Sequence, residues 1–179
     1  MGSLLVPNAQ QEGMVELGTY SFTSVQTATL PFKIFSTAFD NYQININYAQ
    51  NTTAGGIYFY FLSNESNIAT DFYQGGQGWS SAGAAINRAT ANGTVATITG
   101  ATGAKADAGL NSAIIKIFNP LTTGRKNFMW QNTYWNSSDV QNALFGGGFC
   151  SNGNICDGLK FETSAGTMTG TWSVYGMRK

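Results

Sequence analysis

The chain has 179 residues, a length that predicts one domain with room for a hydrophobic core. Only 10 % of its residues are charged, the formal net charge is zero and histidine is absent, whereas an ordinary soluble domain has about 25 % charged residues. We expect no nucleic-acid partner, because there is no basic stripe. We also expect no membrane insertion, because no apolar run approaches the roughly 20 residues that span a bilayer. A neutral, charge-poor surface favours a protein that works within an assembly, where neighbouring subunits cover much of that surface.

Residues 1–13 are predicted to form a short N-terminal arm, and residues 14–179 a single domain. The apolar residues of the arm, which would hold the protein in an assembly, are Leu4, Leu5, Val6 and Pro7.

Strand patterns recur along the chain. In "YQININYAQ" (42–50), Tyr and Ile alternate with the amides of Gln and Asn, which predicts a strand with its Tyr/Ile face on the core. "GGIYFYFLS" (55–63) is apolar on both faces, so we expect burial on both sides, within the fold or at a subunit contact. Pro31 makes its segment an edge strand or a strand start. The further predicted strands are 14–20, 29–35, 93–100, 112–120, 126–135, 143–150, 157–163 and 166–177.

Helix patterns are almost absent. The best exception, "SSAGAAINRAT" (80–90), is predicted to be a loop because of its glycine and flanking polar residues. The glycine clusters "YQGGQGW" and "FGGGF" predict a bulge, a tight bend or a close approach of backbones. Many short strands separated by Gly and Asn turns predict an all-β fold, an antiparallel β-sandwich of the jelly-roll kind.

Catalytic patterns are weak. Without histidine there is no Ser-His-Asp or Cys-His arrangement and no His-based metal site. Neither a phosphate-binding glycine loop nor S-x-x-K is present. A glycosidase would need two carboxylates, but the candidates are scattered and several sit beside turn residues. These candidates are Asp40, Glu65, Asp71, Asp107, Asp139, Asp157 and Glu162. We therefore predict a protein that is not an enzyme and that binds no cofactor or metal.

The two cysteines lie in "CSNGNIC". A three-residue hairpin loop, Asn152 to Asn154, would place Cys150 opposite Cys156, within disulfide range. An oxidising compartment would favour the disulfide and a cytoplasm the reduced pair, and both readings stay open.

Four aromatic residues are candidates for a binding surface, because aromatic faces among Asn, Gln and Gly suit sugar rings or protein partners. They are Trp79, Trp130, Tyr134 and Trp135. Trp130 and Tyr134 share one strand face and Trp135 takes the other. The alternative is that most of them are core, since a sandwich of this size needs large residues inside.

Three segments in order, "FDNYQININYAQ", "AIIKIFNP" and "GLKFETSAGTMTGTWSVYGM", resemble a group of tailed-bacteriophage virion proteins. That group has an early "YDNY-I-I" strand, a central strand ending in "FNP" and a closing "G-x-W-x-V-YG" strand. The resemblance covers roughly residues 20–177. It implies a β-sandwich or jelly roll on the virion surface, often near tail fibres, and it brings no active-site residues.

We therefore expect a non-enzymatic virion structural protein, assembled in the host cytoplasm. Its expected place is the tail, as a fibre, adaptor or receptor-binding component. Its expected partners are other copies of itself in a homotrimer, other virion proteins and a host-surface glycan. The alternatives are a capsid decoration protein, a carbohydrate-binding lectin-like module and a tail-borne glycan hydrolase.

Overall fold

The computed structural model describes residues 13–50, 53–99, 104–105 and 110–177. The chain is all-β, with 66 % strand, and its sheets are antiparallel and pack as a sandwich, as predicted. The described residues include no helix that could cross a membrane. The strands are β1 (Met14–Val25), β2 (Thr27–Thr29), β3 (Asn41–Gln50), β4 (Ile57–Ser63), β5 (Ser66–Ile68), β6 (Phe72–Ser80), β7 (Ala85–Gly93), β8 (Ala96–Thr97), β9 (Asn111–Phe118), β10 (Lys126–Trp135), β11 (Gln141–Cys150), β12 (Gly158–Thr163) and β13 (Met168–Met177).

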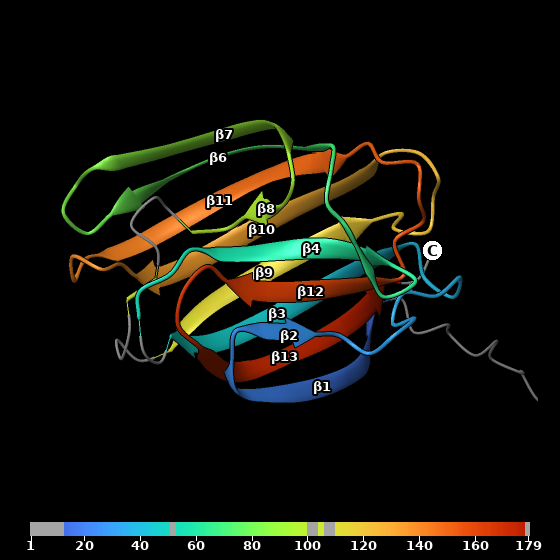
Figure 1. Cartoon of the computed structure of the whole chain (residues 1–179), viewed down its shortest axis with the longest axis horizontal. Helices are drawn as coiled ribbons and strands as arrows, with labels where there is room; N and C mark the ends of the chain where they lie inside the picture. Colours follow the sequence, from blue (N-terminus) through green and yellow to red (C-terminus); the bar gives the residue numbers. More distant parts are fainter. Residues whose placement is uncertain (1–12, 51–52, 100–103, 106–109, 178–179) are drawn as a thin grey trace, which may run out of the picture.

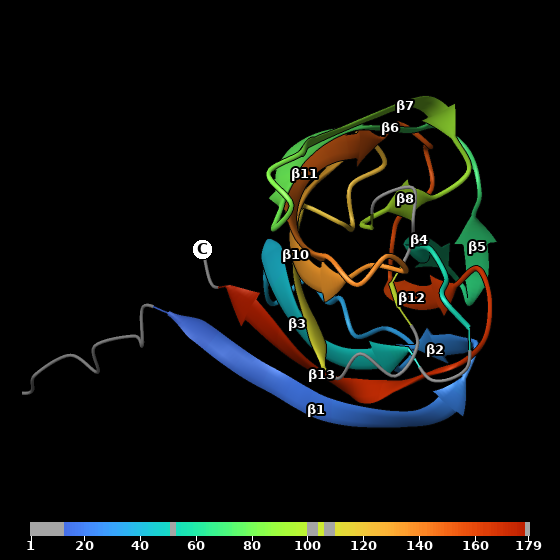
Figure 2. The same cartoon turned by 90° about the vertical axis from the view of Figure 1, so that its left-hand side faces the viewer.

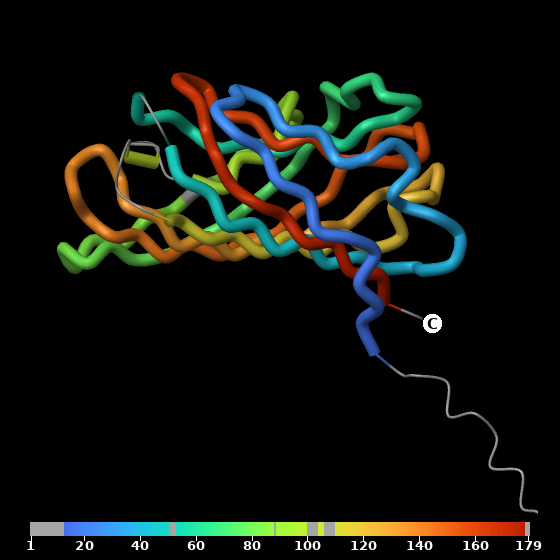
Figure 3. The backbone as a smooth tube through the Cα atoms, turned by 90° about the horizontal axis from the view of Figure 1, so that it is seen from below, coloured from blue at the N-terminus to red at the C-terminus, as the bar shows by residue number. Residues whose placement is uncertain are grey.

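Two sheets face each other across the core (Figure 1). The larger sheet has the strand order β1-β13-β3-β9-β10-β11-β6-β7, and the smaller has the order β2-β12-β4-β5, with β8 paired to β4. Figure 2 shows the larger sheet curving round the smaller one. In Figure 3, β1 runs beside β13, where Met14 pairs with Met177. The larger sheet therefore presents one broad outer face.

The alternating segment 42–50 forms β3 in the middle of the larger sheet, between β13 and β9. Tyr42, Ile44, Ile46 and Tyr48 point into the core, each 0–1 % exposed. The amides between them point to the outer face. The predicted orientation of this strand, with its Tyr/Ile face on the core, is confirmed. A shift of the strand by one residue would turn all four of these side chains to solvent, so the pattern of burial fixes its register.

Strand β4 is buried more completely on one face than on the other. Ile57, Phe59 and Phe61 are fully buried, whereas on the other face Leu62 is buried and Tyr58 and Tyr60 are half-buried. Burial of both faces within the fold is therefore only partly met, and burial at a subunit contact stays a prediction. The outer tyrosines belong to the smaller sheet's outer face, where β12 covers one side of the strand and β5 and β8 the other.

The glycine-rich segment 72–80 and the segment 85–93 form strands β6 and β7, so the prediction of a loop over 80–90 is wrong. The glycines do permit a close approach. A Cβ on Gly76 would lie 2.8 Å from Trp130 Cζ2, and a Cβ on Gly146 would lie 2.7 Å from the same atom. The indole of Trp130 thus occupies space that side chains on β6 and β11 would otherwise fill.

The segment 29–35 is mostly a turn, and the strand predicted there ends at Thr29 as β2. The Ile34 N–H donates to the Pro31 carbonyl (3.2 Å), and Lys33 has a positive φ of 58°. The Ser36 N–H donates to the Tyr42 hydroxyl, which donates back to the Ser36 carbonyl, both at 2.7 Å. Local hydrogen bonds within turns therefore take the place of the strand pairing that the β-rich composition of this segment predicted.

Some polar groups are buried in the core of the sandwich. The Tyr48 hydroxyl donates to Asn132 Oδ1 (3.3 Å), and Asn132 Nδ2 donates to the Ile98 carbonyl (3.1 Å). The Thr97 N–H donates to Gln74 Oε1 (3.1 Å), which ties β8 to β6. These bonds connect the larger sheet to the segment around β8 that covers its inner face.

Candidate functional site

The outer face of the larger sheet carries very few charges. Among strand residues whose side chains the structure describes, only Glu16 and Lys116 are charged and point to this face. Both lie in the half formed by β1, β13, β3 and β9, which otherwise carries a field of amides and hydroxyls. Members of that field are Thr19, Gln43, Asn45, Asn47, Ser112, Thr171 and Ser173.

This polar field is partly bonded within itself. Gln43 Nε2 donates to Asn45 Oδ1 at 3.0 Å, and the Thr19 and Ser173 hydroxyls are 2.6 Å apart. Gln43 and Asn45 are half-buried, although they lie on the outside of the sheet. Uncharged polar groups are cheaper to desolvate than charged ones. This half of the face is therefore suited to being covered by another protein surface.

The other half, formed by β10, β11, β6 and β7, contains a trough of about 480 Å³. Its floor is backbone, since Gly75 pairs with Gly147 and Gly76 with Gly146 across the β6–β11 ladder. A Cβ on Gly147 would lie 3.5 Å from Met129 Cγ and 2.9 Å from the Phe128 carbonyl oxygen. The missing side chains keep the floor open.

The walls of the trough are side chains from four strands: Met129 of β10, Phe145 of β11, Gln77 of β6 and Asn87 of β7. Met129 is 55 % exposed and Phe145 is 40 % exposed. Large apolar groups this accessible on a strand face indicate a contact surface.

Two aromatic pairs flank the glycines along β6 and β11. On one side the rings of Tyr73 and Phe149 stack 4.9 Å apart at 17°, with the Arg125 guanidinium 4.8 Å from the Phe149 ring centre. On the other side the rings of Trp79 and Phe145 lie 5.8 Å apart at 37°. The pairs occupy the outward positions at either end of the glycine run, so the trough is an interruption in an otherwise aromatic stripe.

The four aromatic residues that the sequence offered as binding candidates divide between the outer and the inner face of the larger sheet. Trp79, beside the trough, is 59 % exposed, and Trp135 at the end of β10 is 36 % exposed. Trp130 and Tyr134 are 2 % and 1 % exposed, so their assignment to a binding surface is wrong. They take the inward positions of β10, whose burial alternates strictly from Lys126 to Trp135.

The predicted hairpin between the cysteines is wrong, because β11 and β12 belong to different sheets. Cys150 and Cys156 are both buried, and both are free thiols. The Cys156 thiol donates to the Gly158 carbonyl (3.1 Å), and the Cys150 thiol to the Thr70 carbonyl (3.6 Å). Burial raises the pKa of each thiol, so at neutral pH both stay protonated and are poor nucleophiles.

A buried lysine lies near the two thiols. Lys126 is fully buried, and its ammonium donates to the carbonyls of Gly124 (3.1 Å) and Asn152. Burial lowers the pKa of Lys126. The side chain therefore holds the loop that follows Cys150 against the start of β10.

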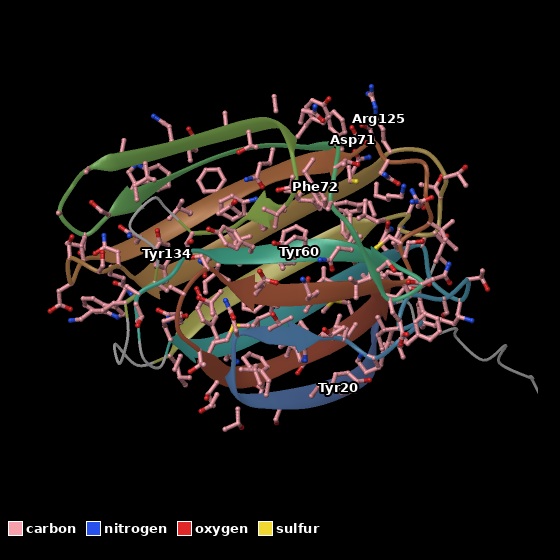
Figure 4. The ribbon with its side chains drawn as sticks, in the orientation of Figure 1. Tyr20, Tyr60, Asp71, Phe72, Arg125 and Tyr134 are labelled. Atoms are coloured by element: carbon pink, nitrogen blue, oxygen red, sulfur yellow. The ribbon has the colours of Figure 1, made fainter. Side chains whose placement is uncertain are left out.

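The outer face of the smaller sheet has a charged cluster of its own. Lys160 pairs with Glu162 (2.8 Å). Its ammonium lies 4.1 Å from the ring centre of Tyr60, a residue of β4 that Figure 4 labels. Burial and the nearby Glu162 charge raise the pKa of Tyr60. Each member already has a partner within the cluster, so it offers no free group for chemistry.

Within the described residues, no group of three or more His, Cys, Asp or Glu could hold a metal ion. The carboxylate candidate Asp157 is buried, and its Oδ2 accepts from the Asn64 N–H (3.2 Å) in the β4–β5 turn. Asp107 and the arm residues Leu4, Leu5, Val6 and Pro7 lie outside the described residues.

Sequence reasoning missed most of the trough. Phe145, Gln77 and Asn87 fall in segments whose glycines interrupt the alternating pattern. The available signal was spacing: Tyr73, Gly75, Gln77 and Trp79 are two residues apart, as on one face of a strand. In comparisons with known proteins, no family model matches the chain and no curated protein matches its sequence.

Proposed function

We propose that this protein is a non-enzymatic structural component of a tailed-bacteriophage virion, associated with the tail and assembled as a homotrimer in the host cytoplasm. The observation that carries the proposal is the charge-poor outer face of the larger sheet, with only Glu16 and Lys116 charged among its described strand residues. A free monomer is kept soluble by surface charge. A face of amides and hydroxyls is stable when a neighbouring subunit covers it.

The strand order supports a jelly roll, the fold that the resemblance implies. Four of the eight strands of the larger sheet (β1-β13-β3-β9) and four of the five strands of the smaller sheet (β2-β12-β4-β5) match the two four-stranded sheets of a jelly roll. Successive strands of this set are distributed over both sheets, as in two interlocked Greek keys. We infer that β10, β11, β6 and β7 enlarge one sheet of a jelly roll, and that the trough belongs to this enlargement.

A non-enzymatic role fits the chemistry of the chain. Histidine is absent from the sequence, and the buried thiols keep their protons because burial raises their pKa. The ammonium of Lys126 is bound to two carbonyls instead of facing a cleft. Attachment needs only complementary surfaces, which the two halves of the outer face supply.

Analytical ultracentrifugation tests the assembly. We expect the wild-type chain to sediment as a trimer and Asn45→Lys, in the polar field, to shift it toward monomer, because a buried unpaired charge is costly. Asn67→Lys, the same change at an exposed site on β5, is the matched control and should leave the trimer intact. A wild-type monomer at micromolar concentration, or equal effects of both variants, would contradict the proposal.

Imaging of virions decides between the two virion roles. Particles labelled through an epitope on the protein should show density at the tail. Density distributed over the capsid shell would instead support the decoration role, for which the same covered face would serve.

A further inference from the structure

We propose that the trough on the larger sheet is a binding site for an uncharged saccharide, built from a bare glycine floor, one aromatic wall and two free amides. The inference deepens the attachment role and rests on it only for the source of the saccharide, the host surface. The binding itself depends on the trough alone.

The amides carry the first part of the argument. Asn87, Gln77, Phe145 and Gln131 form one cross-strand row over β7, β6, β11 and β10. All four are exposed, and Gln77 and Asn87 line the trough, whereas Gln131 lines the neighbouring depression. Within the described residues the side chains of Gln77 and Asn87 have no hydrogen-bond partner. An amide offers both donors and an acceptor, which is what the hydroxyls of a sugar require.

The aromatic wall supplies the apolar contact. Phe145 interrupts the row of amides, and the Trp79 ring beside it is tilted by 37° and remains 59 % exposed. Aromatic faces bury apolar area at little entropic cost, and a sugar ring presents C–H groups on one face and hydroxyls at its rim. The glycine floor lets such a ring lie flat, because no Cβ of Gly75 or Gly147 projects into the trough.

Charge and size select the class of ligand. Among the side chains that the structure describes, none that lines the trough is charged, and Lys116 lines a separate depression of about 80 Å³ on the other side of Met129 and Phe145. A phosphate, a nucleic acid or an acidic peptide would find no counter-charge among these described lining residues. The volume of about 480 Å³ lies within the range of small-molecule sites, about 300–1,000 Å³.

A peptide strand is a poorer occupant. Added strands bind at a free sheet edge, whereas the trough lies on the face of the sheet, over backbone groups already paired in the β6–β11 ladder. A wholly apolar ligand would leave the amides without partners.

The test uses the full chain and a panel of immobilised neutral oligosaccharides of hexoses and N-acetylhexosamines. The saccharide bound best is then measured in solution by calorimetry. Phe145→Ala and Asn87→Ala should each weaken its binding by at least about tenfold, as for one lost contact of about 1.4 kcal/mol. The matched controls Trp135→Ala and Gln141→Ala, an exposed aromatic and an exposed amide outside the trough, should stay within about twofold.

A second readout does not depend on the variants. The methyl signal of Met129 in a methyl-labelled wild-type protein should shift on titration with the saccharide, while the signal of Met14, exposed at the start of β1, should not. Absence of any neutral ligand with Kd below about 1 mM would overturn the inference. Equal losses in the control variants, or binding of acidic glycans alone that Lys116→Ala abolishes, would also overturn it.

Failure here is distinguishable from failure of the assembly. A trimer that binds no saccharide overturns this inference and leaves the structural role standing. A monomer that binds the saccharide overturns the proposed trimer and leaves the proposed saccharide site standing.

Discussion

Replacing Gly146 by alanine tests whether the glycines of β6 and β11 exist to accommodate the indole of Trp130. The new Cβ would lie 2.7 Å from Trp130 Cζ2 and 2.5 Å from the Gly75 carbonyl oxygen. Both distances are below any real Cβ contact, and both partners are held by the sheet, so the ring or a strand must move. Overpacking of this kind costs about 1–3 kcal/mol. We expect Gly146→Ala to lower the free energy of unfolding by about 2 kcal/mol.

A double-mutant cycle separates the indole from the backbone. Trp130→Phe removes the benzo ring and with it Cζ2, which relieves one of the three contacts shorter than 3.0 Å. It also removes Nε1, a buried donor with no partner among the described residues. In the Trp130→Phe background, Gly146→Ala should therefore cost less, with a coupling energy of about 1 kcal/mol. The remaining cost belongs to the contacts with the backbone of Gly75 and Gly76.

The assay is urea unfolding followed by far-ultraviolet circular dichroism, because Trp130→Phe alters the fluorescence. Gly153→Ala is the control: its Cβ would find only the Thr123 carbonyl oxygen at 3.9 Å, so the change should stay within about 0.5 kcal/mol. If the substitutions at Gly146 and Trp130 prove additive, or if Gly146→Ala is neutral, the indole is not the reason for the glycine.

Three further predictions concern buried polar groups. Burial raises the pKa of the Cys156 thiol, so above the unfolded value of about 8.5 only the unfolded chain releases this proton and stability falls as pH rises. Urea melts should show a smaller loss for Cys156→Ala than for wild type between about pH 8.5 and 10.5; parallel pH curves would contradict this. Lys126→Ala should speed alkylation of Cys150 and Cys156 by iodoacetamide at least about tenfold, because the hydrogen bonds from the Lys126 ammonium to two carbonyls hold the loop that follows Cys150. An unchanged alkylation rate would show that other contacts hold this loop. Tyr48→Phe leaves Asn132 Oδ1 without its buried donor and should cost about 1–3 kcal/mol in denaturant unfolding, whereas a neutral result would mean that water replaces the hydroxyl.

The fold could be predicted wherever one face of a strand is buried and the other is not. In β3 the alternation of Ile and Tyr with amides identified both the strand and its core face. The same logic failed at β6 and β7, because glycine and alanine carry too little side chain to mark a face. Their strand character comes from ladder bonds to β11 and to each other, which are contacts distant in sequence.

The candidate site was predictable only in part. Alternation in 126–135 correctly separated Trp130 and Tyr134 from Trp135, but it could not say which set faces the core, since both sets are aromatic. The cysteine hairpin failed for a related reason. Only five residues lie between Cys150 and Cys156, yet this segment crosses from one sheet to the other, and proximity in sequence did not indicate pairing.

The position of β13 has a consequence for how the molecule is made. β13 follows every other strand in the chain, yet it lies between β1 and β3, and in the described structure β1 pairs with no other strand. During synthesis the first strand must wait, unpaired, until residues 168–177 have left the ribosome. Pairing across some 150 residues makes such closure slow. An exposed early strand is also a template for pairing with another chain, so the order of synthesis itself favours contact between nascent copies before each has closed its own sheet.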